Sequence, residues 1–346
     1  MRTNSSTLKD IAKQLGVSVT TVYKALNNKP KVGDELRGKI IKIADELGYS
    51  PNRMAQALAR KPLTITAIVP KYPIEFMSYM EQGIRTAFRE LRSYNVIGLL
   101  EIIRNKEDAH KAWKSLYRRG VSGVVSCFND YNNGLSDILG EMPGFDIPVV
   151  AITTVPRDDT TYIGKFVASG QCLGRMAGQF LGMIVGSRVP VACLIPDFSV
   201  DIHVNSVQGF DEEIRVWGLE NRGVFFSGYD FDKTYQNTKR LFKEHHDLRG
   251  LYVGSSNAYP VCKCAEDLGL EKQICIIGHD LYPELVECIR KGTLTASLFQ
   301  NQYDNAYRSV IALCNYLLRT QKDFQSHYYR PELVLKSNLD LYKGMY

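Results

Sequence analysis

A chain of 346 residues with 45% hydrophobic and 23% charged residues holds enough apolar material for two or three domain cores. This composition excludes a collagenous, a disordered or a disulfide-stapled chain. No apolar run approaches the ~18–20 residues of a membrane span, and none near the start resembles a signal peptide. The eight cysteines are scattered. We therefore expect reduced thiols, a cytoplasmic protein and no membrane partner.

Positive charge is concentrated at the start of the chain. Residues 1–61 contain 12 lysines and arginines against 5 acidic residues, whereas residues 62–346 contain 31 against 32. A small basic segment in front of a near-neutral body indicates a polyanionic partner for that segment, such as a nucleic acid. A basic tail that only improves solubility is the alternative on charge alone.

The basic segment is predicted to form three short helices. Apolar residues recur at helical spacing in 7–15, 19–26 and about 34–47. Thr7 and Gly16 are the residue types that begin and end helices. Two short helices with a glycine turn and a supporting third predict a helix-turn-helix, whose second helix enters the major groove of DNA. A small helical bundle with no DNA partner is the alternative.

Two runs of this segment, Thr7–Asn27 and Gly48–Lys61, resemble the DNA-binding segment of the LacI/GalR (lac-repressor) family of bacterial transcription regulators. The resemblance implies a homodimer that places two headpieces on a pseudo-palindromic double-stranded DNA operator. It also implies a hinge helix over 49–61 that folds on DNA. The DNA-contacting positions that match the family are Thr7, Leu8, Ser18, Val19, Thr20, Thr21, Tyr23, Lys24, Asn27, Lys31, Asn52, Ala55 and Leu58.

The resemblance also assigns roles to several of these positions. Base edges would be contacted by Val19, Thr20 and Lys24. Phosphates would be contacted by Thr7, Ser18, Thr21 and Asn27. Tyr23 stands where the family usually has serine. Leu58 would wedge into the minor groove, where an apolar side chain between base steps bends the duplex; packing under the neighbouring domain is the alternative for this leucine.

From residue 62 onward, apolar β-rich runs alternate with segments of helical period. Such alternation predicts an α/β fold of parallel sheets with helices on both faces. There are too many strand–helix units for one doubly wound sheet, so we predict two lobes. The predicted organisation is a headpiece at 1–48, a hinge at 49–61 and a body at 62–346, with lobe one about 62–162 and 293–323 and lobe two about 163–292 and 324–346.

The body resembles the effector-binding domain of the same family, which is similar to periplasmic sugar-binding proteins. The matching landmarks are Ile65–Lys71, Gly209-Phe210, Ser256-Asn257, Ile277–Asp280, Ser297–Gln300 and Arg330–Lys336. The resemblance implies an all-α helix-turn-helix headpiece joined to an α/β two-lobed, periplasmic-binding-protein-like domain. The effector would be a small carbohydrate or derivative bound between the lobes. The contacts it implies are Phe76, Asn257, Asp280 and Gln300.

Two departures from the family pattern bear on the effector. Ser206 stands where the family commonly has an effector-binding arginine, and Lys165 stands where it usually has an aspartate. If both positions contact the effector, one cation is lost and another arrives from the opposite side of the cleft. That arrangement favours an acidic or phosphorylated sugar. If both are structural, an ordinary neutral sugar remains, and the sequence leaves these alternatives open.

No catalytic, metal or cofactor motif is found in the sequence. There is no Gly-x-Gly-x-x-Gly after a strand and no Walker motif, and Cys262-Lys-Cys264 has the wrong spacing for zinc. We therefore predict no enzyme activity, no metal and no cofactor. The expected function is a ligand-responsive transcription regulator, a repressor of genes for carbohydrate use. A sugar-binding or transport-type receptor without regulatory DNA binding is the alternative.

Overall fold

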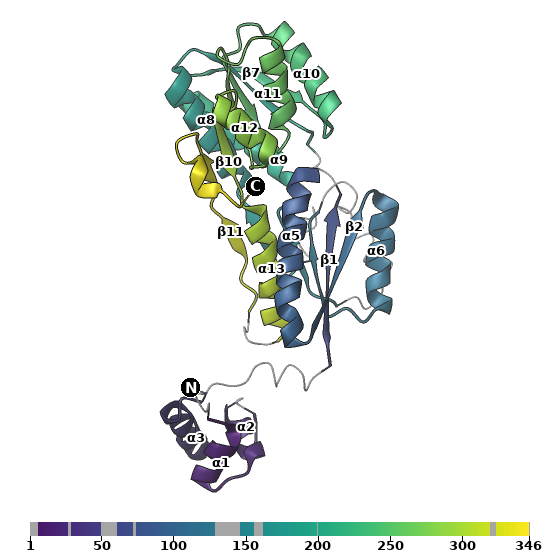
Figure 1. The fold of residues 1–346 in the computed structure, drawn as a ribbon, viewed down its shortest axis with the longest axis vertical. Coiled ribbons are helices and arrows are strands. Elements are labelled where there is room, and N and C mark those ends of the chain that lie inside the picture. The colour runs from purple at the N-terminus through teal and green to yellow at the C-terminus, as the bar shows by residue number, and fades with distance from the viewer. Residues whose placement is uncertain are drawn as a thin grey trace. The chain divides into compact units, whose positions relative to one another are not determined.

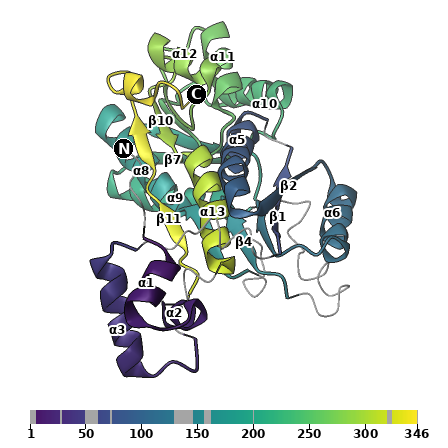
Figure 2. The same ribbon diagram turned by 60° about the horizontal axis from the view of Figure 1, so that its bottom comes forward.

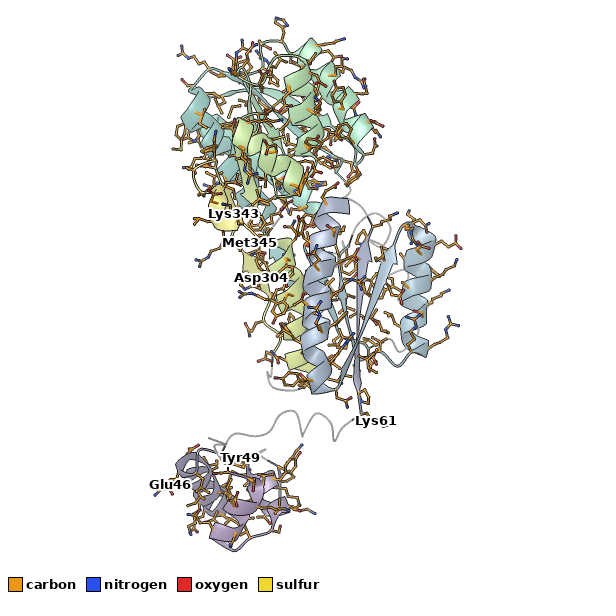
Figure 3. The ribbon with its side chains drawn as sticks, in the orientation of Figure 1. Glu46, Tyr49, Lys61, Asp304, Lys343 and Met345 are labelled. Atoms are coloured by element: carbon orange, nitrogen blue, oxygen red, sulfur yellow. The ribbon has the colours of Figure 1, made fainter. Side chains whose placement is uncertain are left out.

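The computed structural model describes residues 6–26, 29–49, 61–71, 74–128, 146–155, 162–198, 200–318 and 323–345. The chain divides into two compact units, Met1–Lys61 and Pro62–Tyr346 (Figure 1). Lys61 ends the first unit just before the first strand of the second (Figure 3). The predicted DNA contacts Asn27, Asn52, Ala55 and Leu58 lie outside the described residues.

The first unit consists of α1 (Leu8–Leu15), α2 (Val19–Leu26) and α3 (Asp34–Glu46). Their apolar faces enclose a small core of Ile11, Ala12, Val22, Ala25, Ile40 and Ala44. Thr7 begins α1 by donating its N–H and its hydroxyl to Asp10 Oδ2, each at 2.7 Å. Ile41, which the helical pattern places inside, is 44% exposed. It follows Ile40 by about 100° around the helix, and Ile43 packs on the core instead.

The first lobe of the second unit is a parallel sheet in the order β11-β5-β4-β3-β1-β2. Its strands are β1 (Leu63–Pro70), β2 (Val96–Ile103), β3 (Gly123–Ser126), β4 (Val149–Ile152), β5 (Gly164–Ala168) and β11 (His327–Tyr329). One face packs against α5 (Ile74–Leu91) and α13 (Gln302–Leu317), and the other against α6 (Lys106–Arg118). A short 3-10 helix, η1 (Arg92–Tyr94), follows α5.

The second lobe is a sheet in the order β12-β10-β9-β8-β6-β7. Its strands are β6 (Pro190–Ile195), β7 (Glu220–Phe226), β8 (Gly250–Val253), β9 (Cys275–His279), β10 (Ala296–Phe299) and the antiparallel β12 (Glu332–Val334). One face packs on α8 (Gly170–Val185) and α9 (Asp201–Val216). The other face carries α10 (Phe231–Glu244), α11 (Ala258–Asp267), α12 (Pro283–Lys291) and η3 (Leu339–Tyr342). Helices on both faces explain why the inner strands β6, β8, β9 and β10 are almost continuously buried.

The chain passes between the lobes after β5, β10 and β11. Figures 1 and 2 label the strands β10 and β11 that precede two of these crossovers. The predicted lobe boundaries differ from these crossovers. We expected 163–168 and 324–329 in lobe two and 293–299 in lobe one, but β5 and β11 pair in the first sheet and β10 in the second. An apolar strand does not carry in its sequence the identity of its hydrogen-bonded neighbour, so the pattern located the strands without assigning them to a sheet.

Helices α8 and α9 pack backbone against backbone. Glycine recurs at every fourth residue along the facing side of α8, at Gly170, Gly174, Gly178 and Gly182. A Cβ atom at Gly174 would lie 1.9 Å from the carbonyl oxygen of Ser206 on α9. The close approach fixes the position of α9, whose first turn contributes to the site described below. Among the described residues, no helix has the length and hydropathy needed to span a bilayer.

Candidate functional site

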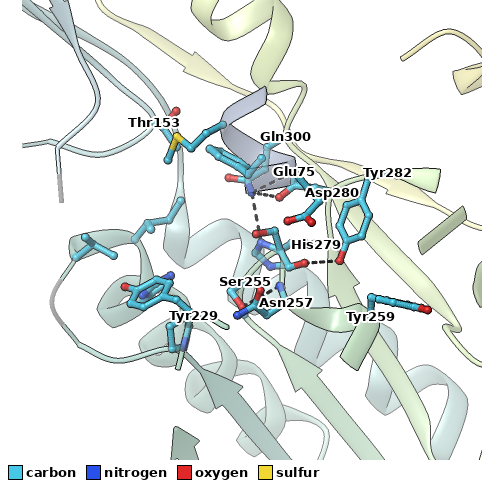
Figure 4. A pocket seen from close by; sticks show the side chains of 18 of the residues that line it. Glu75, Thr153, Tyr229, Ser255, Asn257, Tyr259, His279, Asp280, Tyr282 and Gln300 are labelled. Carbon is cyan, nitrogen blue, oxygen red and sulfur yellow. Dashed lines mark hydrogen bonds between the residues drawn. The ribbon is translucent and has the colours of Figure 1, made fainter. Parts of the chain in front are cut away.

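A cavity of about 640 Å³ opens in the second unit, with lining residues from both lobes (Figure 4). Many of these residues directly follow strands: Cys127-Phe128 after β3, Thr153-Thr154 after β4, Gly254–Asn257 after β8, Asp280 after β9 and Gln300 after β10. Because the strands are parallel, their carboxyl ends meet at one edge of each sheet. That edge is where open α/β sheets bind small ligands.

The floor of the cavity is a chain of buried polar side chains. Gln300 Nε2 lies 3.3 and 3.4 Å from the two carboxylate oxygens of Asp280 and 3.4 Å from His279 Nδ1. His279 Nε2 lies 2.8 Å from Tyr252 Oη. These residues come from β10, β9 and β8 and the positions just after them. This row of hydrogen-bonded side chains therefore crosses the sheet beneath the space that a ligand would occupy.

Burial sets the charge state of this floor. Desolvation lowers the pKa of His279 to about 3, so its ring is neutral. Gln300 Nε2 only donates, so Nδ1 of the neutral ring accepts and Nε2–H donates to Tyr252 Oη. Desolvation also raises the pKa of Asp280 to about 7, although its hydrogen bonds with Gln300 lower it. Asp280 is 1% exposed, so it is a buried carboxyl, and its hydrogen bonds come from the backbone N–H and the side-chain amide of Gln300.

Two residues of the lining hold unusual backbone conformations. Asp280 and Thr153 both have a φ of +67°. This left-handed region is costly for residues with a Cβ, above all for the β-branched threonine. The hydroxyl of Ser297 holds the Asp280 carbonyl oxygen at 2.6 Å. Such strain is typical of ligand sites, where it aims a side chain that regular structure would turn away.

Asn257 is anchored at the start of α11. Its Nδ2 donates to Gly228 O at 2.9 Å and to Thr234 Oγ1 at 3.4 Å. Both of its N–H groups are directed at protein oxygens, so the group it can offer a ligand is the side-chain carbonyl. Tyr282 lies nearby and donates to Ser256 O at 2.7 Å (Figure 4).

Aromatic side chains form much of the cavity wall. Phe76 lies in the first turn of α5 and is 7% exposed. The sequence reasoning did not identify the further aromatic residues of the wall, which are Phe128, Tyr229, Phe231, Tyr259 and Tyr282. His203 on α9 also lines the cavity. Phe128 follows a buried strand, a position that could have identified it.

Lys165 and Ser206 do not line the cavity. Lys165 lies on β5, and its Nζ is 5.4 Å from the ring centroid of Tyr328 beside the edge strand. Ser206 is 1% exposed and donates to His203 O at 2.9 Å, one turn earlier on α9. The structure therefore brings together Phe76, Asn257, Asp280 and Gln300, but not these two predicted contacts.

The first unit presents the outer face of α2. Val19 and Tyr23 are 39% and 42% exposed, Thr20 is exposed, and Lys24 is half-buried. Ser18 begins the helix by accepting from Thr21 N–H at 3.0 Å. Of the other predicted contacts, Thr7 and Lys31 are exposed, whereas Leu8 packs against the core.

Arg37 of α3 holds the end of α2 in place. Its guanidinium donates to the carbonyl oxygens of Ala25 and Lys29 at 2.9 Å and of Val32 at 3.2 Å. Carbonyls in the last turn of a helix lack partners within the helix, so one cation fixes both the end of α2 and the loop after it.

Both units match known families. Residues 7–52 match the bacterial regulatory proteins of the lacI family, and residues 65–321 match the periplasmic binding protein domain. The chain is 25% identical over 281 residues to catabolite control protein A of Priestia megaterium, covering 79% of this chain and 82% of that protein. It is 22% identical over 293 residues to the ribose operon repressor of Lactococcus lactis, covering 81% and 84%. The fold is similar to GanP, a glucose-galactose binding protein of Geobacillus stearothermophilus, with a TM-score of 0.71 at 19% identity, covering 81% of this chain and 99% of that one.

Proposed function

The chain belongs to the lacI family of bacterial regulatory proteins, and on that premise we propose that it represses genes of carbohydrate use under the control of a sugar-like effector. It is a DNA-binding transcription regulator. The observation that carries the proposal is the pairing, in one chain, of a helix-turn-helix with a cavity whose floor presents Asp280, Asn257 and Gln300. We also propose that it acts in the cytoplasm, where its DNA is.

The effector would act through the two lobes. A ligand that contacts Phe76 on the first lobe and Asp280 on the second binds best at one spacing of the lobes. A coupling free energy of ~1–3 kcal/mol between the cavity and the headpiece would change DNA affinity about 5- to 150-fold. Coupling is reciprocal, so DNA would change effector affinity by the same factor.

We propose that the regulator binds DNA as a homodimer on a pseudo-palindromic operator. Val19, Thr20 and Lys24 would contact base edges, with Tyr23 on the same exposed face of α2. Thr7, Ser18 and Thr21 would contact phosphates, and Leu8 and Lys31 are further DNA-contacting positions on the family resemblance. The hinge contacts Asn52, Ala55 and Leu58, and the phosphate contact Asn27, remain part of this proposal on the family resemblance.

A transport-type sugar receptor is the second candidate, because the body has the fold of such proteins. The exposed face of α2 favours the regulator. A receptor that only binds sugar does not require a separately folded helical unit whose exposed face carries Val19, Thr20 and Tyr23.

The test is to select duplexes from a random pool with the full chain and to measure affinity by fluorescence anisotropy. Regulatory DNA binding requires enrichment of a two-fold-related sequence. Affinity should fall steeply with salt, with a log–log slope of about −0.9 per neutralised phosphate. A sugar panel should then change affinity for the selected duplex. Failure to enrich any sequence would favour the receptor, and one monomer per selected site by sedimentation would contradict the dimer.

A further inference from the structure

The cavity has a one-sided charge. Carboxylates reach it from both lobes, and among its described lining residues there is no lysine or arginine. Glu75 comes from α5 of the first lobe, and the second lobe contributes Asp230, Asp280 and Glu284. Asp280 is buried in the floor, whereas the other three are exposed. A ligand entering the cavity meets exposed carboxylates at its entrance, and at its base it meets the Asp280 carboxyl, whose pKa burial raises to about 7.

His279, the histidine of the floor, does not offset this charge. His279 is neutral, because burial lowers its pKa to about 3. His203 Nδ1 lies 3.1 Å from the carbonyl oxygen of Asp197, so that nitrogen serves the protein backbone. Neither ring provides the fork of donors with which arginine binds phosphate or carboxylate groups.

The cation predicted from the sequence lies elsewhere. Lys165 Nζ is placed over the ring of Tyr328. Its charge also acts on Asp201, where it lowers the pKa of that carboxyl against the raising effect of burial. Lys165 thus interacts with Tyr328 on β11 and with Asp201 on α9, and it is not among the described residues that line the cavity. The alternative in which it contacts an anionic effector has no support from its position.

The neutral groups of the lining favour ligands that donate hydrogen bonds. The carboxyl of Asp280 only accepts hydrogen bonds when it is ionised, and Asn257 has its amide N–H groups on protein oxygens. Faces of aromatic rings, such as Phe76 and Tyr282, suit the apolar C–H face of a sugar ring and attract positive charge. Acceptors, aromatic faces and carboxylates together repel anions.

We propose that the cavity selects a donor-rich ligand without negative charge, namely a free polyol or an amino sugar, and excludes phosphate esters, uronic acids and nucleotides. The inference rests on the proposed function, because it names the effector class of the same site. It decides between the neutral and the acidic sugar, which the sequence leaves open.

The experiment uses matched triplets of probes on the full chain. Each triplet contains a parent aldose, its 2-amino-2-deoxy analogue and its 6-phosphate, in series that include disaccharides, with binding measured by thermal shift and calorimetry. We expect a parent or amino sugar to bind at least about tenfold more tightly than its phosphate, a difference of about 1.4 kcal/mol. A phosphate that binds as tightly as its parent overturns the inference and leaves the regulator intact. If no probe binds, the sugar effector fails, and the inference fails with it, whereas DNA binding is judged separately.

A pair of variants on one helix tests whether the carboxylates of the lining cause this preference. Glu284 and Glu287 both lie on α12 and are exposed, but only Glu284 lines the cavity. Glu284→Lys should narrow the preference for a parent sugar over its 6-phosphate, because it places a cation at the entrance. Glu287→Lys makes the same charge change outside the cavity and should leave the preference unchanged. Equal effects of the two variants would show a long-range charge effect and not selection by the lining.

Discussion

Gln300 donates its side-chain amide to both carboxylate oxygens of Asp280, at 3.3 and 3.4 Å, from the point where the chain leaves the second lobe. Two residues later the chain begins α13 of the first lobe. The same amide lies 3.4 Å from His279 Nδ1. Asp280, which we assign as a hydrogen-bond acceptor for the ligand, is thus hydrogen-bonded to a residue at the crossover between the lobes. A ligand donating to Asp280 would alter contacts at that crossover.

Asp280→Asn should therefore weaken effector binding without weakening DNA binding. The carboxylate gives charge-assisted hydrogen bonds, and losing one costs about 1.5–3 kcal/mol, or roughly 10- to 150-fold in affinity. The measurement is sugar titration of the variant, first alone and then bound to its selected duplex. Normal effector affinity would show that the ligand does not contact Asp280. Lost DNA binding would show that Asp280 supports the fold.

The pH dependence follows from the raised pKa of Asp280, about 7 in the folded protein against an ordinary value of 3.8. Between these values the folded protein holds a proton that the unfolded chain has released. Ionisation of Asp280 therefore lowers the free energy of unfolding as pH rises from about 4 to about 7, by about 1.4 kcal/mol for each pH unit. Chemical denaturation across this window should show a shallower fall for Asp280→Asn than for the wild type.

Effector affinity should change in the opposite direction. Ligand hydroxyls donate to the ionised carboxylate, so binding should strengthen as pH rises towards the Asp280 pKa and level off above it. Calorimetry in buffers of different ionisation enthalpy should detect proton release on binding near pH 6 to 7. Binding that is independent of pH in the wild type would mean that the ligand does not select the ionised form.

Lys24→Ala should reduce discrimination among DNA sequences by ~1–3 kcal/mol if the lysine contacts a base edge. Lys24 is half-buried on the outer side of α2, close to the exposed Tyr23. The measurement compares affinity for the selected duplex with affinity for one-base variants of it. A loss that is equal on all sequences, with a smaller salt dependence, would instead identify a phosphate contact.

Arg37→Ala should destabilise the headpiece and weaken DNA binding. The guanidinium donates to four carbonyl oxygens at the end of α2 and in the next loop, and hydrogen bonds to charged groups contribute about 1.5–3 kcal/mol. Lys39→Ala on the same helix removes the same charge but breaks only an exposed pair with Glu35. Such a pair contributes about 0–1 kcal/mol. Fluorescence anisotropy at one salt concentration should show a larger loss of DNA affinity for Arg37→Ala than for Lys39→Ala. Equal losses of DNA affinity would mean that only the removed charge matters.

Sequence patterns predicted most of the fold because helical and strand periods are local properties. The helices at 8–15 and 19–26 and the two α/β lobes are as expected. The lobe membership of β5 and β10 differs because strand pairing is not encoded locally. In the candidate site, Asp280 and Asn257 were found from a family pattern. Phe128 and Tyr229 were not, since nothing in an isolated aromatic residue shows which cavity it will face.

The glycines of α8 provide a graded test of packing. A Cβ at Gly174 meets backbone atoms, Ser206 O at 1.9 Å and Phe210 N at 2.6 Å, whereas one at Gly178 meets Glu213 Cβ at 2.9 Å and Phe210 O at 3.3 Å. The overlap at Gly174 is the deeper of the two and involves backbone, so Gly174→Ala should cost more than ~1–3 kcal/mol, the usual range for overpacking. Gly178→Ala should cost less, because alanine also favours the helix by about 0.5–1 kcal/mol. Both tryptophans of the chain lie in the second unit, so denaturation of the full chain followed by their fluorescence reports this unit. Equal stabilities of the two variants would mean that α8 and α9 move apart readily.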